Sequence, residues 1–352
     1  DRTLDIKNYE SRSDNRFIDI NKRENYLFNS SINGIEESDL IFLIGTNPRY
    51  EATILNARIR KSFLNNNTKV ISLNDLGDLT FPYESLDGKT QTLKDIFEDN
   101  NEISKKIIAA DKPMIILGES LLNLKSSKYF FNIIKEFLVS NDKINDDWNS
   151  FNILSSDAAT VGNFDLGLVN EDNNLLEDLQ NHKFDIIYLV GQDNLNFDKK
   201  DEFIIYQGSH GDKGAEMADI ILPGSAYTEQ DGFFTNLEGN LQKAYKASYP
   251  PGDAKEDWQI INELAEVMNN RKLFNDKDEL ESSMINYLNL QKEKQNSLVD
   301  QNKNISTDDF NNEALTVSVK DYYFSNVIAR SSKTMVECNN SKLNLKPTGT
   351  EG

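Results

Sequence analysis

Cysteine and histidine are scarce in this chain. Its 352 residues include one cysteine, Cys338, and two histidines, His182 and His210. A single thiol excludes an internal disulfide framework, a zinc site built from several cysteines and a cysteine-ligated iron–sulfur cluster. Neither histidine has a second histidine or a cysteine near it in the sequence, so no metal-ligand pattern is present. We therefore expect no metal ion and no iron–sulfur cluster to bind here.

Long apolar runs and clustered positive charge are also missing. No stretch approaches the about eighteen consecutive apolar residues of a membrane-spanning helix. The 58 acidic and 38 basic residues give a formal net charge of −20, which argues against a nucleic-acid or anionic-membrane surface. A free-standing nucleotide-binding module is one alternative. However, no G-x-G-x-x-G or G-x-x-x-x-G-K-[ST] fingerprint follows any of the predicted strands.

The clearest repeated pattern is a short apolar run that ends in a glycine. Such runs occur at 39–44 before Gly45, at 114–117 before Gly118 and at 185–190 before Gly191. Continuous apolar runs of this length are typical of strands buried on both faces. Residues 69–73 and 202–206 have the pattern of further strands, after stretches with helical character. Strands that alternate with helices predict an α/β fold in Rossmann-like layers, with a parallel sheet and helices on both faces.

Two of the runs, SDLIFLIG and FDIIYLVG, are close copies. We interpret them as two similar halves, although strand–glycine turns are common enough in α/β folds to allow coincidence. The repeat predicts that Gly45 and Gly191 occupy equivalent turns at the carboxyl ends of parallel strands.

The expected domain layout is a leading segment at 1–37, an α/β core at 38–269 with halves at about 38–150 and 151–269, and a helical extension at 270–352. Within the extension, 299–312 is expected to be a flexible linker and 339–352 a disordered tail.

Gly45, Thr46, Asn47 and Pro48 form a turn between a predicted strand and a helix expected at 51–64. Backbone N–H groups exposed at a helix N-terminus suit an anion. The alternative is a tight strand-to-helix turn that serves folding alone.

Basic residues gather just after this turn, at Arg49, Arg58, Arg60 and Lys61. On a helix, Arg58 and Lys61 share a face. The cluster is a candidate docking face for an acidic partner, or else a solvated helix end.

His210 and Asp212 lie in a glycine-flanked loop after a predicted strand. Such a pair could relay protons, but no nucleophile is identified for it to serve, which favours a structural or interface role. His182 is expected to be exposed. Cys338 is expected to act as a small hydrophobic residue, buried or facing a partner.

Residues 218–242 combine a short strand, an Asp231-Gly232 turn, the aromatic pair Phe233-Phe234 and a Glu238-Gly239 turn. This segment resembles the ADVVLP…E-DG-FTN-EGR-Q signature of the molybdopterin oxidoreductase superfamily. Three further segments resemble, within that superfamily, the large iron–sulfur subunit (the 75 kDa or G subunit) of respiratory NADH:quinone oxidoreductase, or complex I. They lie at 24–63, 203–224 and 319–338. The aromatic pair between two glycine turns predicts an ordered loop with at least one of the two rings buried.

The resemblance implies a fold of the molybdopterin oxidoreductase type with a helical C-terminal extension. In that superfamily the G-x-N-P turn contacts the pyranopterin dinucleotide, whereas the complex I subunit is understood to hold no molybdenum cofactor. Asn240 stands where the signature has an arginine, which removes a cation that could meet phosphate. The resemblance therefore implies that the turn at 45–48 is vestigial. It implies no cofactor and no catalytic residue in this portion.

The resemblance also implies a role inside an NADH:ubiquinone oxidoreductase that couples electron transfer to proton translocation. The chain would be a structural C-terminal portion, because the family's N-terminal part carries the iron–sulfur clusters. Its partners would be other peripheral-arm subunits and that cluster-bearing part. Its location would be the matrix face of the mitochondrial inner membrane, or the cytoplasmic face of an α-proteobacterial inner membrane. The alternative is a fragment of a true molybdopterin-dependent oxidoreductase such as formate dehydrogenase.

Overall fold

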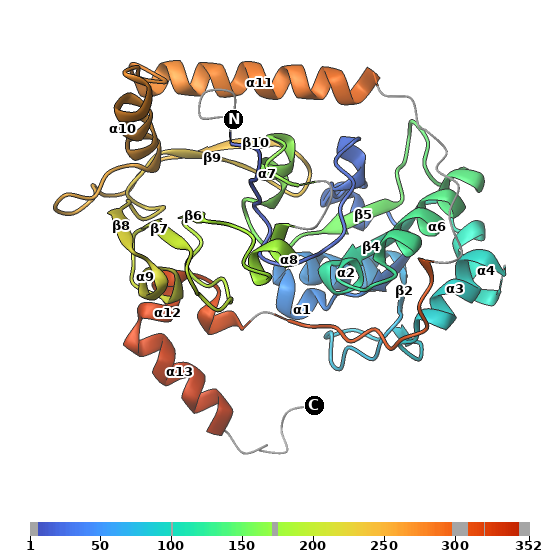
Figure 1. The fold of residues 1–352 in the computed structure, drawn as a ribbon. Helices are drawn as coiled ribbons and strands as arrows, with labels where there is room; N and C mark the ends of the chain where they lie inside the picture. The colour runs from blue at the N-terminus through green and yellow to red at the C-terminus, as the bar shows by residue number, and fades with distance from the viewer. Residues whose placement is uncertain (1–5, 100, 171–174, 298–308, 320, 345–352) are drawn as a thin grey trace.

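The computed structural model describes residues 6–99, 101–170, 175–297, 309–319 and 321–344. In this part of the chain, two parallel sheets lie side by side with an antiparallel ribbon (Figure 1). The first sheet has five strands in the order β3-β2-β1-β4-β5, and every neighbouring pair is parallel. Its strands are β1 (Leu40–Ile44), β2 (Lys69–Ser72), β3 (Glu84–Ser85), β4 (Pro113–Gly118) and β5 (Phe151–Leu154). The predicted parallel α/β fold is confirmed.

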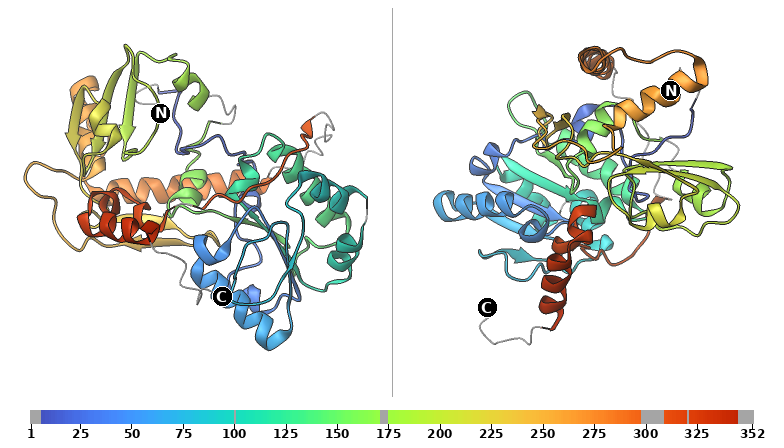
Figure 2. Two further views of the ribbon diagram at one scale, coloured as in Figure 1. Left: turned by 90° about the horizontal axis from the view of Figure 1, so that it is seen from below. Right: turned by 90° about the vertical axis from the view of Figure 1, so that its left-hand side faces the viewer.

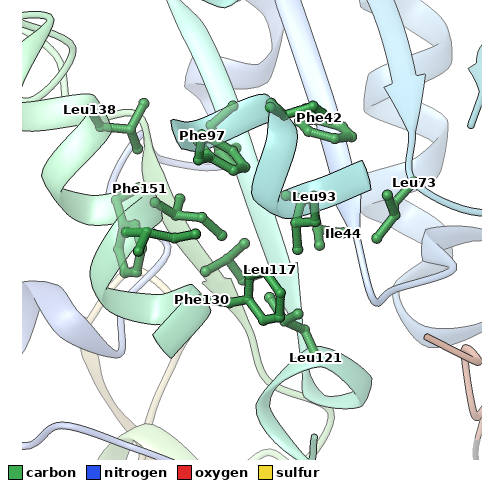
Figure 3. Close-up of a cluster of buried hydrophobic side chains, with 14 of the residues drawn as sticks. Phe42, Ile44, Leu73, Leu93, Phe97, Leu117, Leu121, Phe130, Leu138 and Phe151 are labelled. Atoms are coloured by element: carbon green, nitrogen blue, oxygen red, sulfur yellow. The ribbon is translucent and has the colours of Figure 1, made fainter. Parts of the chain in front are cut away.

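Helices pack on both faces of the first sheet, because successive side chains of a strand point to opposite faces. Phe42 of β1 stacks on Phe97 of α3, with 6.4 Å between ring centres, in the cluster drawn in Figure 3. The flanking Ile41 and Leu43 pack instead with Ile59 of α2. The elements of this part are η1 (Arg23–Asn25), η2 (Asn33–Glu36), α1 (Pro48–Glu51), α2 (Thr53–Asn66), α3 (Thr90–Glu98), α4 (Glu102–Ala109), α5 (Glu119–Leu122) and α6 (Ser127–Ser140).

The second sheet is smaller and has the order β6-β7-β8, again parallel. Its strands are β6 (Ile186–Val190), β7 (Phe203–Gly208) and β8 (Ile220–Pro223), and the helices α8 (Leu175–Gln180) and α9 (Lys213–Met217) pack on it. The short helix α7 (Thr160–Asp165) packs instead with Tyr26 of the N-terminal segment. Gly191 follows β6 with φ 61° as Gly45 follows β1 with φ 69°. The predicted equivalence of these turns, each after a parallel strand, is confirmed.

Burial of the second sheet differs from the prediction. One face packs under α8 and α9 through Ile187, Leu189 and Leu179. On the other face Ile186 and Val190 are exposed. The expectation that β6 is buried on both faces is wrong, because described helices cover one face only. A continuous apolar run therefore indicates a strand with apolar side chains on both faces. It does not show that other elements of the chain pack on both of those faces.

The ribbon β9 (Gly232–Thr235) and β10 (Leu241–Ala244) is antiparallel, and the long helix α11 (Lys277–Ser297) runs beside it (Figure 1). In the sequence, the helix α10 (Asp257–Asn269) follows the ribbon and precedes α11. The loop is ordered as predicted, but the expected burial of Phe233 or Phe234 is wrong, since both are half-buried. A two-stranded ribbon cannot enclose an aromatic pair, and the Lys243 ammonium lies 5.3 Å from the centre of the Phe233 ring.

After α11 the chain returns to the first sheet (Figures 1 and 2). Phe310 and Leu315 join its core, so residues 309–312 are not the flexible linker that was predicted; 298–308 lie outside the described residues. The last elements are η4 (Tyr322–Phe324), α12 (Val327–Ser331) and α13 (Lys333–Asn344). The prediction of a disordered tail is wrong for 339–344, which are helical, and 345–352 lie outside the described residues. None of the described helices is both long and apolar enough to cross a bilayer.

Candidate functional site

The carboxyl ends of β1 and β4 meet at two glycines. A Cβ on Gly45 would lie 2.6 Å from the Leu121 backbone nitrogen, and one on Gly118 would overlap the Gly45 carbonyl oxygen. Gly45 also has φ 69°, which disfavours any residue with a side chain. Both glycines are therefore required by the close approach of the two turns. In open parallel sheets this edge is where ligands bind.

The predicted anion turn is filled by a carboxylate of the same chain. The Thr46 hydroxyl and the Asn47 backbone N–H both donate to Oε2 of Glu51, the latter at 2.7 Å. The Asn47 side chain caps α1 by accepting from the Arg49 N–H at 3.2 Å, and its amide donates to the Leu76 carbonyl. These two donors of the turn are thus already paired with Glu51.

An arginine from the N-terminal segment lies at the same edge of the first sheet, where β1 and β4 end. Arg16 is buried and its guanidinium contacts the carboxylates of Glu119, next to Gly118, and Asp14, the latter at 2.6 Å. Glu119 also accepts the Ser156 N–H at 2.9 Å. Burial alone would raise the pKa of Asp14, but the charge and hydrogen bond of Arg16 outweigh it and lower that pKa. This edge therefore presents carboxylates that are neutralised internally.

The second sheet carries a matching arrangement at the carboxyl ends of β6 and β7. Arg330 of α12 donates to Asp193, two residues after Gly191, at 2.6 Å, and to Asp212 at 2.7 Å. Burial raises the pKa of Asp193 and the Asp212 charge adds to this, while Arg330 offsets a part. For Asp212, burial is outweighed by the hydrogen bond from Arg330, so its pKa is lowered. One arginine thus holds two carboxylates and binds Asp212 as its charged form.

The predicted basic cluster is paired within the chain. Arg49 binds Asp78 at 2.6 Å. Arg58 and Lys61 do share a face, and both bind Glu36 at 2.9 and 2.7 Å. Arg60 is exposed. Three of the four cations of the candidate docking face therefore have an intramolecular carboxylate partner, which reduces their attraction for an external one.

The predicted His210–Asp212 pair is not brought together as a relay. The His210 ring hydrogen-bonds the neighbouring Ser209 hydroxyl at 2.9 Å, while the Asp212 carboxylate caps α9 and binds Arg330. His182 was expected to be exposed but contacts the Glu202 carboxylate at 2.6 Å. Cys338 is exposed on this chain, so it is not buried within it; the other expected alternative, that it faces a partner, stays a prediction. No group of three or more His, Cys, Asp or Glu suited to a metal ion occurs among the described residues.

A third arginine lies at the Glu-Gly turn of the ribbon loop. Arg23 donates to the Gly239 carbonyl at 2.6 Å and to both oxygens of Asp165. Gly239 directly precedes Asn240, which stands where the signature has an arginine. The charge of Arg23 is paired with the Asp165 carboxylate. Sequence reasoning missed Arg16, Arg23 and Arg330. Only Arg330 had a local signal, because it lies in the family-like segment 319–338.

Comparison with known proteins gives two matches to family models. The model described as molybdopterin oxidoreductase matches residues 2–267. The model for the C-terminal part of the G subunit of NADH-ubiquinone oxidoreductase matches residues 286–338.

Curated relatives agree with these matches. The chain is 38% identical to a mitochondrial NADH-ubiquinone oxidoreductase 78 kDa subunit of Candida albicans, over 90% of this chain and 45% of the relative. It is 36% identical to the 75 kDa subunit of Reclinomonas americana, over 94% and 49%. It is 36% identical to the G subunit of the NADH-quinone oxidoreductase of Rickettsia bellii, over 98% and 50%. The chain thus spans about half the length of the curated relatives it matches, and the resemblance seen in its motifs is confirmed.

Proposed function

This chain belongs to the molybdopterin oxidoreductase family, and we propose that it is a structural portion of the large peripheral-arm subunit of respiratory complex I. The family match across residues 2–267, the G-subunit match at 286–338 and relatives named as 75 and 78 kDa subunits support this proposal. In this role the chain supports NADH-to-quinone electron transfer coupled to proton translocation. It contributes shape and docking surface rather than a reacting group.

The observation that carries the structural role is the pairing of Glu51 with the turn at 45–48. A pterin dinucleotide carries phosphates, which need free N–H donors and cations. Here the Asn47 N–H and the Thr46 hydroxyl already serve the Glu51 carboxylate. The residues present therefore do not fit the cofactor that the family name implies.

Charge at both sheet edges supports the same proposal. The edge of the first sheet presents Glu119 and Asp14 around Arg16, and the edge of the second presents Asp193 and Asp212 around Arg330. A phosphate group placed at either edge would meet carboxylates and would compete with them for the arginine. We propose that these edges bind the chain's own N-terminal and C-terminal segments instead of a ligand.

The proposal is tested on the complex that contains this chain. Elemental analysis for molybdenum and tungsten, normalised to protein, should find neither in stoichiometric amount. Titration of the isolated chain with inorganic pyrophosphate in a calorimeter should give no saturable heat. Stoichiometric metal together with saturable pyrophosphate binding would instead favour a fragment of a molybdopterin enzyme such as formate dehydrogenase.

A second measurement tests the role in the assembly. Arg16→Ala should lower the amount of assembled complex while NADH-to-quinone turnover per assembled complex stays near that of the wild type. Normal assembly with turnover abolished would contradict a structural role.

We further propose the matrix face of the mitochondrial inner membrane as the location, with other peripheral-arm subunits and a cluster-bearing polypeptide as partners. The mitochondrial name of the Candida albicans relative supports this location; the Rickettsia bellii relative leaves the cytoplasmic face of an α-proteobacterial membrane as the alternative. Fractionation followed by alkaline extraction distinguishes a peripheral protein, which is released, from an embedded one.

A further inference from the structure

The second sheet has an apolar face that the described helices leave mostly uncovered. Parallel sheets occur almost only where both faces are covered by other elements, because their strands are apolar on both sides. The covered face packs under α8 and α9. On the opposite face, which we call the open face, Ile186, Val190, Phe203 and Ile220 are 65%, 47%, 43% and 44% exposed. Isolated exposed apolar residues are ordinary, but a contiguous row of them across a sheet is not.

Strand register shows that these side chains form one surface. Ile186 is paired with Phe203, and Ile205 with Ile220, and in a parallel sheet paired residues point to the same side. Gln207 is the polar member of the open face and is satisfied, since it accepts from Tyr188 and donates to the Asp257 carboxylate at 2.7 Å. The start of α10 therefore covers one end of the open face and leaves the rest uncovered.

A groove continues the open face beyond its edge strand. It has a volume of about 540 Å³ and lies between β8 and the start of α10. Its apolar lining includes Leu222, Pro223 and Ile260, and its charged lining includes Asp253 and Glu263. Lys255 also lines it but is paired with Glu263 at 2.7 Å. The unpaired charge of the groove is thus acidic, like the chain as a whole.

We propose that the open face and this groove dock an amphipathic helix of another polypeptide, apolar along one side and flanked by lysine or arginine. A helix is the element that covers parallel sheets, and helices already cover the other face here. The basic flanks follow from the acidic groove and the net charge of −20. A second copy of this chain fits less well, because it would bring an equal negative charge to the contact.

Adjacent residues of β8 supply a matched pair of variants. Ile220 lies on the open face, whereas Ile221 is 55% exposed but points to the opposite side. Ile220→Lys should weaken incorporation of the chain into its assembled complex about tenfold, while Ile221→Lys should leave it unchanged. Both side chains are exposed, so the melting temperature of the isolated chain should not fall with either. Equal effects of the two substitutions on incorporation would overturn the proposal.

The identity of the occupant is tested by cross-linking in the assembled complex. A p-benzoylphenylalanine residue in place of Phe203 should cross-link, on irradiation, to a helical segment of another polypeptide that carries apolar and basic residues. Cross-links confined to this chain or to a second copy would overturn the proposal, as would a concentration-dependent dimer in light scattering that Ile220→Lys abolishes. Failure here would not affect the proposed membership in complex I, because assembly can use other surfaces.

Discussion

Arg330 and Asp193 lie 137 residues apart in the sequence, and their side chains meet at 2.6 Å at the carboxyl end of β6 in the second sheet. Asp193 follows the glycine turn of β6, and Arg330 lies on α12 near the end of the described chain. The same guanidinium holds Asp212 at 2.7 Å. This contact anchors the C-terminal helices to an edge of the sheet where other α/β proteins bind ligands.

We expect Arg330→Ala to loosen this anchor. A hydrogen bond to a charged group contributes about 1.5–3 kcal/mol to the free energy of unfolding. In the variant, two partly buried carboxylates would lose their partner. The variant should melt at a lower temperature, and hydrogen exchange should increase over α12 and α13. Arg330→Lys should lie between the variant and the wild type, because one ammonium cannot reproduce the planar fork. The exposed Arg271→Ala is the control and should behave like the wild type.

The two glycine turns predict unequal responses to the same change. Alanine in a left-handed conformation costs about 1–2 kcal/mol at either position. At Gly45 the new methyl group would also overlap Leu121, whereas at Gly191 nothing lies within 4 Å. Gly45→Ala should therefore cost about 1–3 kcal/mol more than Gly191→Ala. Denaturant unfolding measures the difference; equal losses would show that the β1–β4 approach is not tight.

The aromatic pair of the ribbon should contribute less than a core ring. Phe131 is buried in the first sheet's core, where truncation to alanine costs about 3–5 kcal/mol. Phe234 is half-buried, so Phe234→Ala should cost about 1–2 kcal/mol. Thermal melting of Phe234→Ala and Phe131→Ala tests this order. A larger loss from Phe234→Ala would mean that the ring is enclosed more fully than a two-stranded ribbon allows.

Glu256 predicts a dependence of stability on pH. Its carboxylate accepts from Lys277, Trp258 and Lys246. Burial would raise its pKa, but these contacts outweigh burial and lower the pKa below its usual 4.5. A lowered folded-state pKa contributes stability that is present above pH 4.5 and is lost as pH falls through the folded-state value.

Glu256→Gln should therefore reduce stability at neutral pH and flatten the fall of melting temperature in acid. The measurement is a series of thermal melts from pH 7 downward. Glu256 caps the N-terminus of α10. Glu266→Gln, at an exposed position within that helix, provides the control and should retain the wild-type profile. An unchanged acid profile for Glu256→Gln would contradict the assigned coupling.

Local sequence patterns predicted β1, β4 and β6 because each strand is a continuous apolar run closed by glycine. They did not predict the exposure of Ile186, because burial depends on covering elements that lie outside the strand's own sequence. The positions of Arg16 and Arg330 were also unpredictable, since neither is near all of its carboxylate partners in the sequence. Residues 339–344 were expected to be disordered, and their polar composition offers no apolar stripe that would have indicated a helix. The predicted burial of Phe233 or Phe234 was wrong for a related reason. Two adjacent aromatic residues indicate packing, but a two-stranded ribbon covers them on one side only.

Residues 309–319 give the first sheet a late dependence on the rest of the chain. Leu315 is buried in that sheet's core, and Glu313 hydrogen-bonds Thr90 across 223 residues. During synthesis, the ribosome releases the strands β1 to β5 long before it makes these core residues. The core of the first sheet therefore stays incompletely packed while the second sheet, the ribbon and α11 are synthesised. Contacts at such separation slow folding and prolong the exposure of apolar surface, so this protein should need chaperone protection while it is being made.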